Sequence, residues 1–522
     1  MNIKYLPPIV AGIALAVGMV ACHPDQLTSL NTDPNNPTDA PPGPLFTASV
    51  NTAVGRWLPL SNVGILAQQW AQTTYPQEDE YINLQADRTS GLFDGPYTGE
   101  LENLRKIVAK GQALKQPGVY GPAMVLQTWS FENMTDIFGD IPYSDALKGD
   151  TTGGSLAPAY DPQKDIYAGF FSALSAATAA MASDPAADPG LGSADPIYGG
   201  VVGNWEKFAN SLHARLAMRL VNVDPATASA ELKAAFNAPG GVFTSNADNA
   251  KLVWPGDGVN DNPFAENLKL RDDIRLSRTL MNIMVPSNDP RLQVYAQPVV
   301  DSSLFPNGYG GMPNGLSQDS AGKWFKLASR PGVMFYPGVT TYGTFGSSAG
   351  LATPSYLMTY AELLFIEAEA DERGLGGRTP GQAKADYDAA ITASLEQWGI
   401  TDPAAISGFL AEPAVAYKGG TDGLKQIAVQ KWVALFMDGV QAWAEWRRTC
   451  QPSTVAPGPA AIVDFVPRRF FYSNTETSVN AENLNAAIAR QGPDNFETRM
   501  YWDTKPQAAP TYVDAATCGP VS

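Results

Sequence analysis

Apolar residues recur at helical spacing along most of the chain. The clearest case is 204–223, where one apolar stripe is formed by Trp205, Phe208, Leu212, Leu216 and Leu220. Asn204 can cap the start of this helix, and Arg215 and Arg219 lie one turn apart on its flank. The same spacing predicts a helix pair over 46–75 and single helices over 97–111, 121–137, 355–373, 381–398 and 423–448. Glycines are expected to end three of them, at Gly111, Gly374 and Gly399.

The helical pattern fails between about 240 and 350. This stretch has short apolar runs at 251–254 and 333–336, many glycines and several aromatic residues. It predicts loops with a few short strands or hairpins. The expected fold is therefore all-α: a scaffold of helix pairs of tetratricopeptide size, interrupted by a loop-rich irregular insert. The tetratricopeptide consensus itself is poorly matched.

The first residues have the form of an export signal. Lys4 supplies a positive charge, and 9–20 is an apolar stretch too short to span a bilayer. It ends at Cys22 in the form of a lipobox, which predicts a signal peptide at 1–21 and a lipid-anchored cysteine. Residues 22–45 would be a Pro/Asn-rich tether and 46–522 a single binding domain. The alternative is an ordinary cleaved signal with a chance cysteine.

Charge and cysteine content narrow the class of protein. The net charge of −17 excludes nucleic acid as a partner, because binding it requires a basic face. The same acidity disfavours strongly anionic substrates, since like charges repel. Beyond Cys22 the chain has Cys450 and Cys518, which can pair in an oxidising compartment or remain two buried thiols.

No catalytic or metal-binding pattern emerges, and we expect no enzyme and no metal site. The chain has two histidines, His23 and His213, and no zinc motif. The sequence 346–350 matches G-x-S-x-G, but no histidine follows it to complete a triad. Carboxylates at Glu362, Glu367, Glu369 and Glu372 crowd one predicted helix, where structural roles are expected in place of a glycosidase pair. Asp301 and Asp319, in the loops, are no more specific.

Binding is the remaining class of function, and loop aromatics are its candidates. Sugars and peptides are held by aromatic faces with polar groups around them. Two clusters stand out, 70–97 (Trp70, Tyr75, Tyr81, Phe93 and Tyr97) and 305–342 (Phe305, Tyr309, Trp324, Phe325, Tyr336 and Tyr342). From these we select as candidate ligand-binding residues Tyr75, Tyr81, Tyr309, Trp324 and Tyr342. Each of them could instead belong to the core.

Several motifs in order resemble the SusD/RagB family of outer-membrane lipoproteins, in its SusD-like subgroup. They are Thr135–Ala146 (TDIFGDIPYSDA), Asn204–Leu212 with Arg215 and Arg219, Asn288–Arg291, Tyr360–Ala370, Gln430–Trp432, Trp443–Arg448, Pro467–Arg469 with Tyr472, and Tyr501–Asp503. They cover nearly the whole mature chain. Most of these motifs are expected to stabilise the scaffold and not to bind a ligand. Phe138–Pro142, for instance, is predicted to be a turn in which Gly139 is free to take a positive φ.

The resemblance implies an all-α fold whose irregular part forms the ligand face. It also implies lipid anchoring at the outer membrane, facing outward, and a SusC-like, TonB-dependent transporter as partner, which the lipoprotein covers as a lid. Members bind glycans, and some bind peptides. No ligand residue carries over, because no loop motif matches. A lipid-anchored helical scaffold that binds only proteins is the alternative, and the sequence identifies neither the ligand nor any calcium site.

Overall fold

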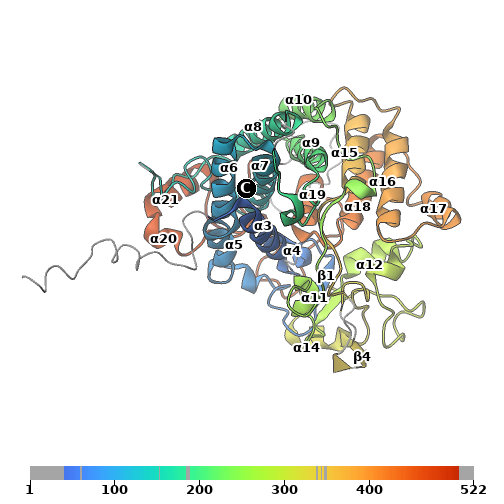
Figure 1. The fold of residues 1–522 in the computed structure, drawn as a ribbon. Helices are drawn as coiled ribbons and strands as arrows, with labels where there is room; N and C mark the ends of the chain where they lie inside the picture. Colours follow the sequence, from blue (N-terminus) through green and yellow to red (C-terminus); the bar gives the residue numbers. More distant parts are fainter. Residues whose placement is uncertain are drawn as a thin grey trace, which may run out of the picture.

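The computed structural model describes residues 40–58, 61–151, 153–183, 188–336, 339–341, 344–345 and 350–504. Helices make up most of this part, and Figure 1 shows them as two groups above a region of loops and short strands. The predicted all-α scaffold with a loop-rich insert is confirmed. Within the described residues, no helix is both long enough and apolar enough to cross a membrane.

The N-terminal group of helices packs in chain order. α3 lies on α6, α6 on α7, α7 on α8, α8 on α9, and α9 on α10. The helices of this half are α3 (Pro42–Trp57), α4 (Ser61–Leu66), α5 (Ala86–Thr98), α6 (Glu100–Leu114), α7 (Pro117–Phe138), α8 (Gln163–Ala182), α9 (Val202–Arg219) and α10 (Pro225–Phe236). Neighbours in sequence are thus neighbours in space, as in a stack of helix pairs.

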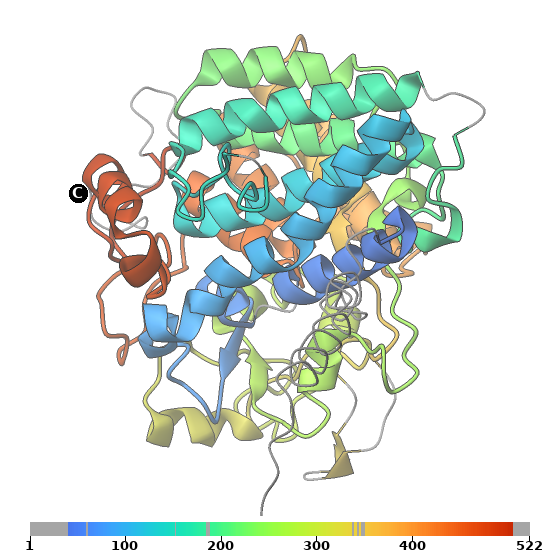
Figure 2. The same ribbon diagram turned by 60° about the vertical axis from the view of Figure 1, so that its left-hand side comes forward.

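The C-terminal group comprises α15 (Tyr360–Arg373), α16 (Ala383–Gln397), α17 (Pro403–Leu410), α18 (Gly420–Ala434) and α19 (Gly439–Thr449). α15 packs on α16, α18 and α9, and α19 packs on α4 and α7, so the two groups share one interior. The chain returns to the N-terminal group with α20 (Glu476–Val479) and α21 (Ala481–Gln491), drawn in red in Figure 2. There Arg490 pairs with Asp140 (Nη2–Oδ2 2.7 Å).

The loop-rich insert lies between the two helix groups in sequence. In space it lies below them, at the bottom of Figures 1 and 2. Its helices are α11 (Pro263–Asn267), α12 (Arg278–Met284), α13 (Leu292–Tyr295) and α14 (Gln318–Ala321). The strands are β1 (Trp70–Gln72), β2 (Ala250–Leu252), β3 (Ile274–Leu276), β4 (Val339–Thr341), β5 (Thr344–Phe345) and β6 (Ser355–Met358). They form three antiparallel pairs, β1–β3, β2–β6 and β4–β5. Single turns of 3₁₀ helix occur at Ile82–Leu84, Gly192–Ala194, Asn246–Asp248 and Gly322–Phe325.

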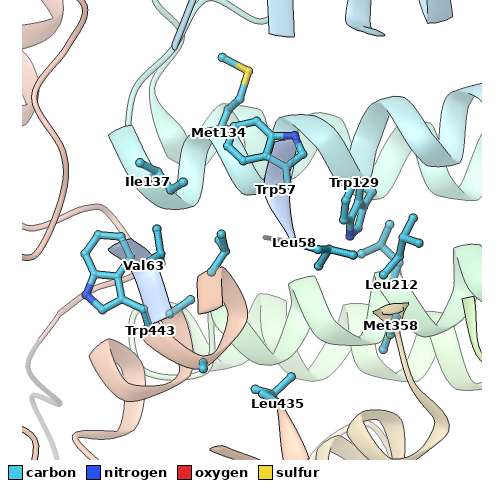
Figure 3. Packing of buried hydrophobic residues seen from close by; sticks show 14 of the residues in the cluster. Trp57, Leu58, Val63, Trp129, Met134, Ile137, Leu212, Met358, Leu435 and Trp443 are labelled. Atoms are coloured by element: carbon cyan, nitrogen blue, oxygen red, sulfur yellow. The ribbon is translucent and has the colours of Figure 1, made fainter. Parts of the chain in front are cut away.

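One hydrophobic core joins the helix groups. Figure 3 shows part of this core, to which Trp57 of α3, Trp129 of α7, Leu212 of α9, Leu435 and Trp443 of α19 contribute. All five side chains are buried. The indole Nε1 of Trp57 donates to Ser130 Oγ at 3.2 Å, so its polar atom is satisfied in the interior.

Arg215 and Arg219 are not on the flank of their helix, as the apolar stripe predicted, but inside the protein. Arg215 Nη2 lies 2.6 Å from Glu132 Oε2 on α7, and its Nη1 lies 3.3 Å from Glu362 Oε2 on α15. Arg219 Nη2 lies 3.3 Å from Asp136 Oδ2. The long side chains reach carboxylates on facing helices, so burial becomes tolerable.

Several predicted boundaries were wrong for local reasons. The span 423–448 is two helices, because Met437 takes φ 78° and Asp438 caps α19 by accepting from Gln441 N at 3.2 Å. Residues 355–358 form β6 before Thr359 caps α15. α6 runs past Gly111 to Leu114, and a Cβ at Gly111 would lie 2.8 Å from Tyr120 Cβ. That glycine permits close packing in place of ending the helix.

The N-terminal half departs from the predicted pattern in the same way. The predicted pair over 46–75 is α3, α4 and β1, and α3 begins at Pro42, inside the stretch assigned to the tether. Gly374 and Gly399 do follow α15 and α16, both with positive φ.

Candidate functional site

Three arginines of the segment 271–278, here called the arginine strip, each lie over an aromatic ring of the loop-rich insert or its neighbour. The distances from guanidinium carbon to ring centroid are 5.0 Å for Arg271 and Tyr75, 4.5 Å for Arg275 and Phe325, and 5.2 Å for Arg278 and Trp324. Strand β3 forms the centre of this strip. It therefore brings aromatics from two distant segments along one strand.

Pairing of β3 with β1 sets the register of the strip. Arg275 lies opposite Ala71, and Thr73 N donates to Asp273 O at 2.8 Å just beyond the strand. Tyr75 follows two residues later and reaches Arg271. The hydrogen-bonded ladder thus fixes where the loop carrying Tyr75 leaves the sheet.

The carboxylate of Asp272 links the arginine strip to the 322–336 segment. It accepts from Arg330 Nη2 at 2.6 Å and from Arg275 Nη1 at 2.9 Å, and Tyr336 Oη donates to it at 3.0 Å. Burial alone would raise the pKa of Asp272, but Arg330 and Arg275 hold that pKa below its ordinary value. Arg275 also donates to Phe325 O at 2.7 Å. These contacts hold the 322–336 segment, which carries Trp324, against the strip.

Hydrogen bonds of Asp79 and Asn314 join the loop that carries Tyr75 to the 310–316 loop. Asp79 accepts from Gln72 N at 2.6 Å and from Asn314 Nδ2 at 2.6 Å, and Asn314 also donates to Trp70 O at 2.8 Å. Burial raises the pKa of Asp79 to about 7. The buried carboxyl is therefore a pH-sensitive part of the support beneath the aromatic residues.

The structure separates the five selected aromatics. Tyr75 is 49% exposed, and Trp324 and Tyr309 are half-buried, all at or near the loop-rich insert. Tyr81 is only 2% exposed, so its selection as a ligand-binding residue was wrong. It has φ 66° and packs into the main core, so no ring face remains for a ligand. Tyr342 lies outside the described residues.

The other members of the two aromatic clusters divide in the same manner. Trp70, Phe93 and Tyr336 are buried, whereas Tyr97, Phe305 and Phe325 are half-buried. Arg271 and Arg278 are exposed, and sequence reasoning missed both as part of the site. No local signal was available, because the segment 271–278 contains no aromatic residue and its ring partners are far away in sequence.

A cavity of about 760 Å³ lies elsewhere, between α5, the 142–158 loop and the start of α20. Phe93, Tyr97 and Leu147 line it, and Leu156 at its edge is 88% exposed. A second hollow of about 500 Å³ is bordered by α8, α10 and Tyr501. Neither was foreseen from the sequence, because each combines segments more than 100 residues apart.

The residues set aside as unlikely catalysts have structural partners. Glu362 and Glu369 contact Arg215 and Arg448, and Glu372 accepts from Tyr417 Oη at 2.6 Å. His213 is buried, stacks on Phe171 at 5.0 Å, and places Nε2 2.7 Å from Glu231 Oε2. In the portion of the chain that is described, no group of three His, Cys, Asp or Glu is arranged to hold a metal ion.

The structure describes only some of the residues of the predicted lipid anchor and disulfide. Cys22 and Cys518 lie outside the described residues, as does the tether up to residue 39. Cys450 is disulfide-bonded and ends α19. Its pairing with Cys518 stays a prediction.

The motifs that carry the family resemblance lie mainly in the interior. Gly139 has φ 84°, and its neighbour Asp140 accepts from Gln163 N at 2.8 Å. The Arg291 guanidinium forms an ion pair with the Asp289 carboxylate, with Nη2–Oδ2 at 2.7 Å. These residues hold helices and turns together, so the motifs mark a scaffold and not the ligand face.

A helical scaffold with an irregular, aromatic-bearing insert defines the class: a binding protein built on helix pairs. The model of the SusD-like family, described as starch-binding and associating with the outer membrane, matches residues 34–473. The chain therefore belongs to the SusD-like family of outer-membrane-associated proteins. A search of curated sequences finds no match.

Solved structures agree with this family. One described as a chitin-binding protein is 25% identical with a TM-score of 0.75, covering 89% of this chain and 100% of its own. A chitin-binding SusD homologue from Flavobacterium johnsoniae is 27% identical with a TM-score of 0.72, covering 88% and 97%. A SusD homologue from Bacteroides uniformis is 25% identical with a TM-score of 0.75, covering 90% and 100%.

Proposed function

We propose that this protein captures an oligosaccharide at the outer membrane and delivers it to a TonB-dependent transporter, which it covers as a lid. The observation that carries the proposal is the set of accessible aromatics on the loop-rich insert of a SusD-like scaffold, led by Trp324 and Tyr75. Flat aromatic faces with nearby guanidinium donors are the groups that bind sugars. Two similar structures are described as chitin-binding, which favours a glycan over a peptide.

The protein acts as a binding protein and not as an enzyme in this proposal. Lipidation at Cys22 would anchor it to the outer membrane with the loop-rich insert facing the transporter. The alternative, a scaffold that binds only proteins, leaves the accessible aromatics without a role.

Location of the ligand can be tested with two variants. Trp324→Ala should weaken oligosaccharide binding at least tenfold while the melting temperature falls by less than about 4 °C, because the ring is half-buried. Leu156→Ser alters the rim of the 760 Å³ cavity at an exposed position, and it should leave binding unchanged. Loss of binding in Leu156→Ser alone would move the ligand to that cavity.

The lid role has a separate test. The full chain, extracted from outer membranes in mild detergent, should co-purify with a TonB-dependent barrel. Recovery of the chain without that barrel, while oligosaccharide binding persists, would leave capture standing and remove the lid.

A further inference from the structure

Arg278 differs from the rest of the arginine strip in having no carboxylate partner. Arg271 pairs with Asp273, and Arg275 Nη1 lies 2.9 Å from Asp272 Oδ1. Across the residues that the structure describes, no carboxylate lies within 4.0 Å of the Arg278 side chain, which is exposed. Its guanidinium lies over the ring of Trp324. In a protein with 52 acidic residues, this leaves an available guanidinium at the ligand face.

The surroundings of Trp324 depart from the charge of the whole protein. Lys323 and Lys326 flank the ring in sequence; both are exposed, and neither forms an ion pair with a described residue. In segment 296–336 Arg330 is paired with Asp272, which leaves these two lysines against two carboxylates, Asp301 and Asp319. Charges more than about 8 Å apart are largely screened at physiological salt. Arg278, which lies over the ring, is therefore the cation that distinguishes the Trp324 surface.

Arg278 is held in place before any ligand arrives. Its backbone N donates to Met312 O at 2.7 Å, and a Cβ at Gly311 would lie 2.5 Å from Arg278 Cα, so the start of α12 touches the 310–316 loop. The contact with the indole restricts the guanidinium, and no carboxylate of a described residue occupies its donors. A restricted fork loses little entropy when it binds a carboxylate or sulfate with two parallel hydrogen bonds.

We propose that the stacked pair of Arg278 and Trp324 binds an acidic group of an oligosaccharide, so that the ligand class is an anionic glycan bearing carboxylate or sulfate. This inference rests on the proposed function and narrows it. It reverses the expectation drawn from net charge, because Arg278 places a cation without a carboxylate partner over Trp324 although the chain as a whole is acidic.

The test is calorimetric titration of the full chain in detergent with four kinds of probe. They are oligogalacturonate for carboxylate, a sulfated but carboxylate-free carrageenan oligosaccharide for sulfate, chitohexaose as a neutral glycan, and an oligoglutamate peptide. Arg278→Gln is compared with Arg88→Gln, which makes the same charge change at an exposed helix position paired with Asp87.

At least one acidic oligosaccharide should bind, and Arg278→Gln should weaken it by about tenfold or more, as loss of a charge-assisted pair does. Arg88→Gln should not weaken it. The arm that binds identifies carboxylate or sulfate as the recognised group. Chitohexaose binding with silence from both acidic glycans would overturn the inference and leave glycan capture intact. Equal losses in the two variants would also overturn it. Binding of the peptide alone would remove both the inference and the proposed function.

Discussion

Arg448 and Glu369 form a bidentate ion pair in the interior, with Nη1–Oε1 at 2.7 Å and Nη2–Oε2 at 2.6 Å. The pair joins α19 to α15, and both side chains are buried. Burial alone would raise the pKa of Glu369, but Arg448 and Arg373 hold that pKa far below its ordinary value. The scaffold that positions the loop-rich insert thus depends on compensated charges between its helices.

Removing one partner of this pair should be strongly destabilising. Glu369→Gln leaves Arg448 with less compensation and should lower the free energy of unfolding at pH 8 by about 3 kcal/mol, measured by chemical denaturation. Because the folded pKa is depressed, the stability that Glu369 contributes is present above its unfolded pKa of about 4.5 and is lost as pH falls toward the folded value.

Glu367, two residues away on the same helix, provides the control. Burial raises its pKa to about 7, and the nearest guanidinium nitrogen of Arg378 is 3.7 Å away. Glu367→Gln should therefore be neutral or stabilising at pH 8. Equal losses in the two variants would contradict the role assigned to the Arg448 pair.

Asp79 should make stability depend on pH with the opposite sign. Its folded pKa of about 7 exceeds the ordinary value of 3.8, so the folded state binds the proton more tightly. The contribution is full below about pH 4 and is lost as pH rises through about 7, on the order of 4 kcal/mol. Denaturation of Asp79→Asn should lack this part of the pH slope. Parallel pH profiles for the variant and the native protein would contradict a raised pKa.

Gly139 should tolerate no side chain. It has φ 84° and ψ −123°, and a Cβ would lie 2.0 Å from Gln491 Oε1. Gly139→Ala should lower the free energy of unfolding by about 3 kcal/mol, combining backbone strain with the clash. Gly374→Ala, also at positive φ but in open space, should cost only about 1 kcal/mol. A smaller loss at Gly139 than at Gly374 would show that the turn rearranges freely.

The predicted disulfide between Cys450 and Cys518 can be tested by peptide mapping. Digestion without reductant should yield one cross-linked peptide containing Cys450 and Cys518, and Cys518→Ser should lower stability by about 3 kcal/mol. Recovery of both residues as free thiols from oxidised protein would contradict the pairing.

The helical half of the fold could be predicted from the sequence, and its failures have physical causes. The stripe of 204–223 indicates α9 directly, because every third or fourth position is apolar. The span of α8 was missed, since alanine fills much of it and weakens the contrast between its faces. The break between α18 and α19 was hidden because Met437 takes a positive φ that its sequence does not indicate.

The site was only partly predictable. Tyr75 and Tyr81 lie six residues apart in equally polar surroundings, yet one is exposed and the other buried. The difference follows from Asp79, which ties the loop inward through Gln72 and Asn314, a contact between segments over 230 residues apart. The contact of Arg278 with Trp324 is also between different segments of the chain. Sequence periodicity cannot report either contact.

The most direct test of the account is calorimetric titration of the full chain, and of Trp324→Ala, with oligosaccharides of several classes, followed by analysis of the sugars recovered. One class of oligosaccharide should bind the native protein, be recovered uncleaved, and bind Trp324→Ala at least tenfold more weakly. Absence of binding across all glycan classes, or cleavage of the bound sugar, would contradict it.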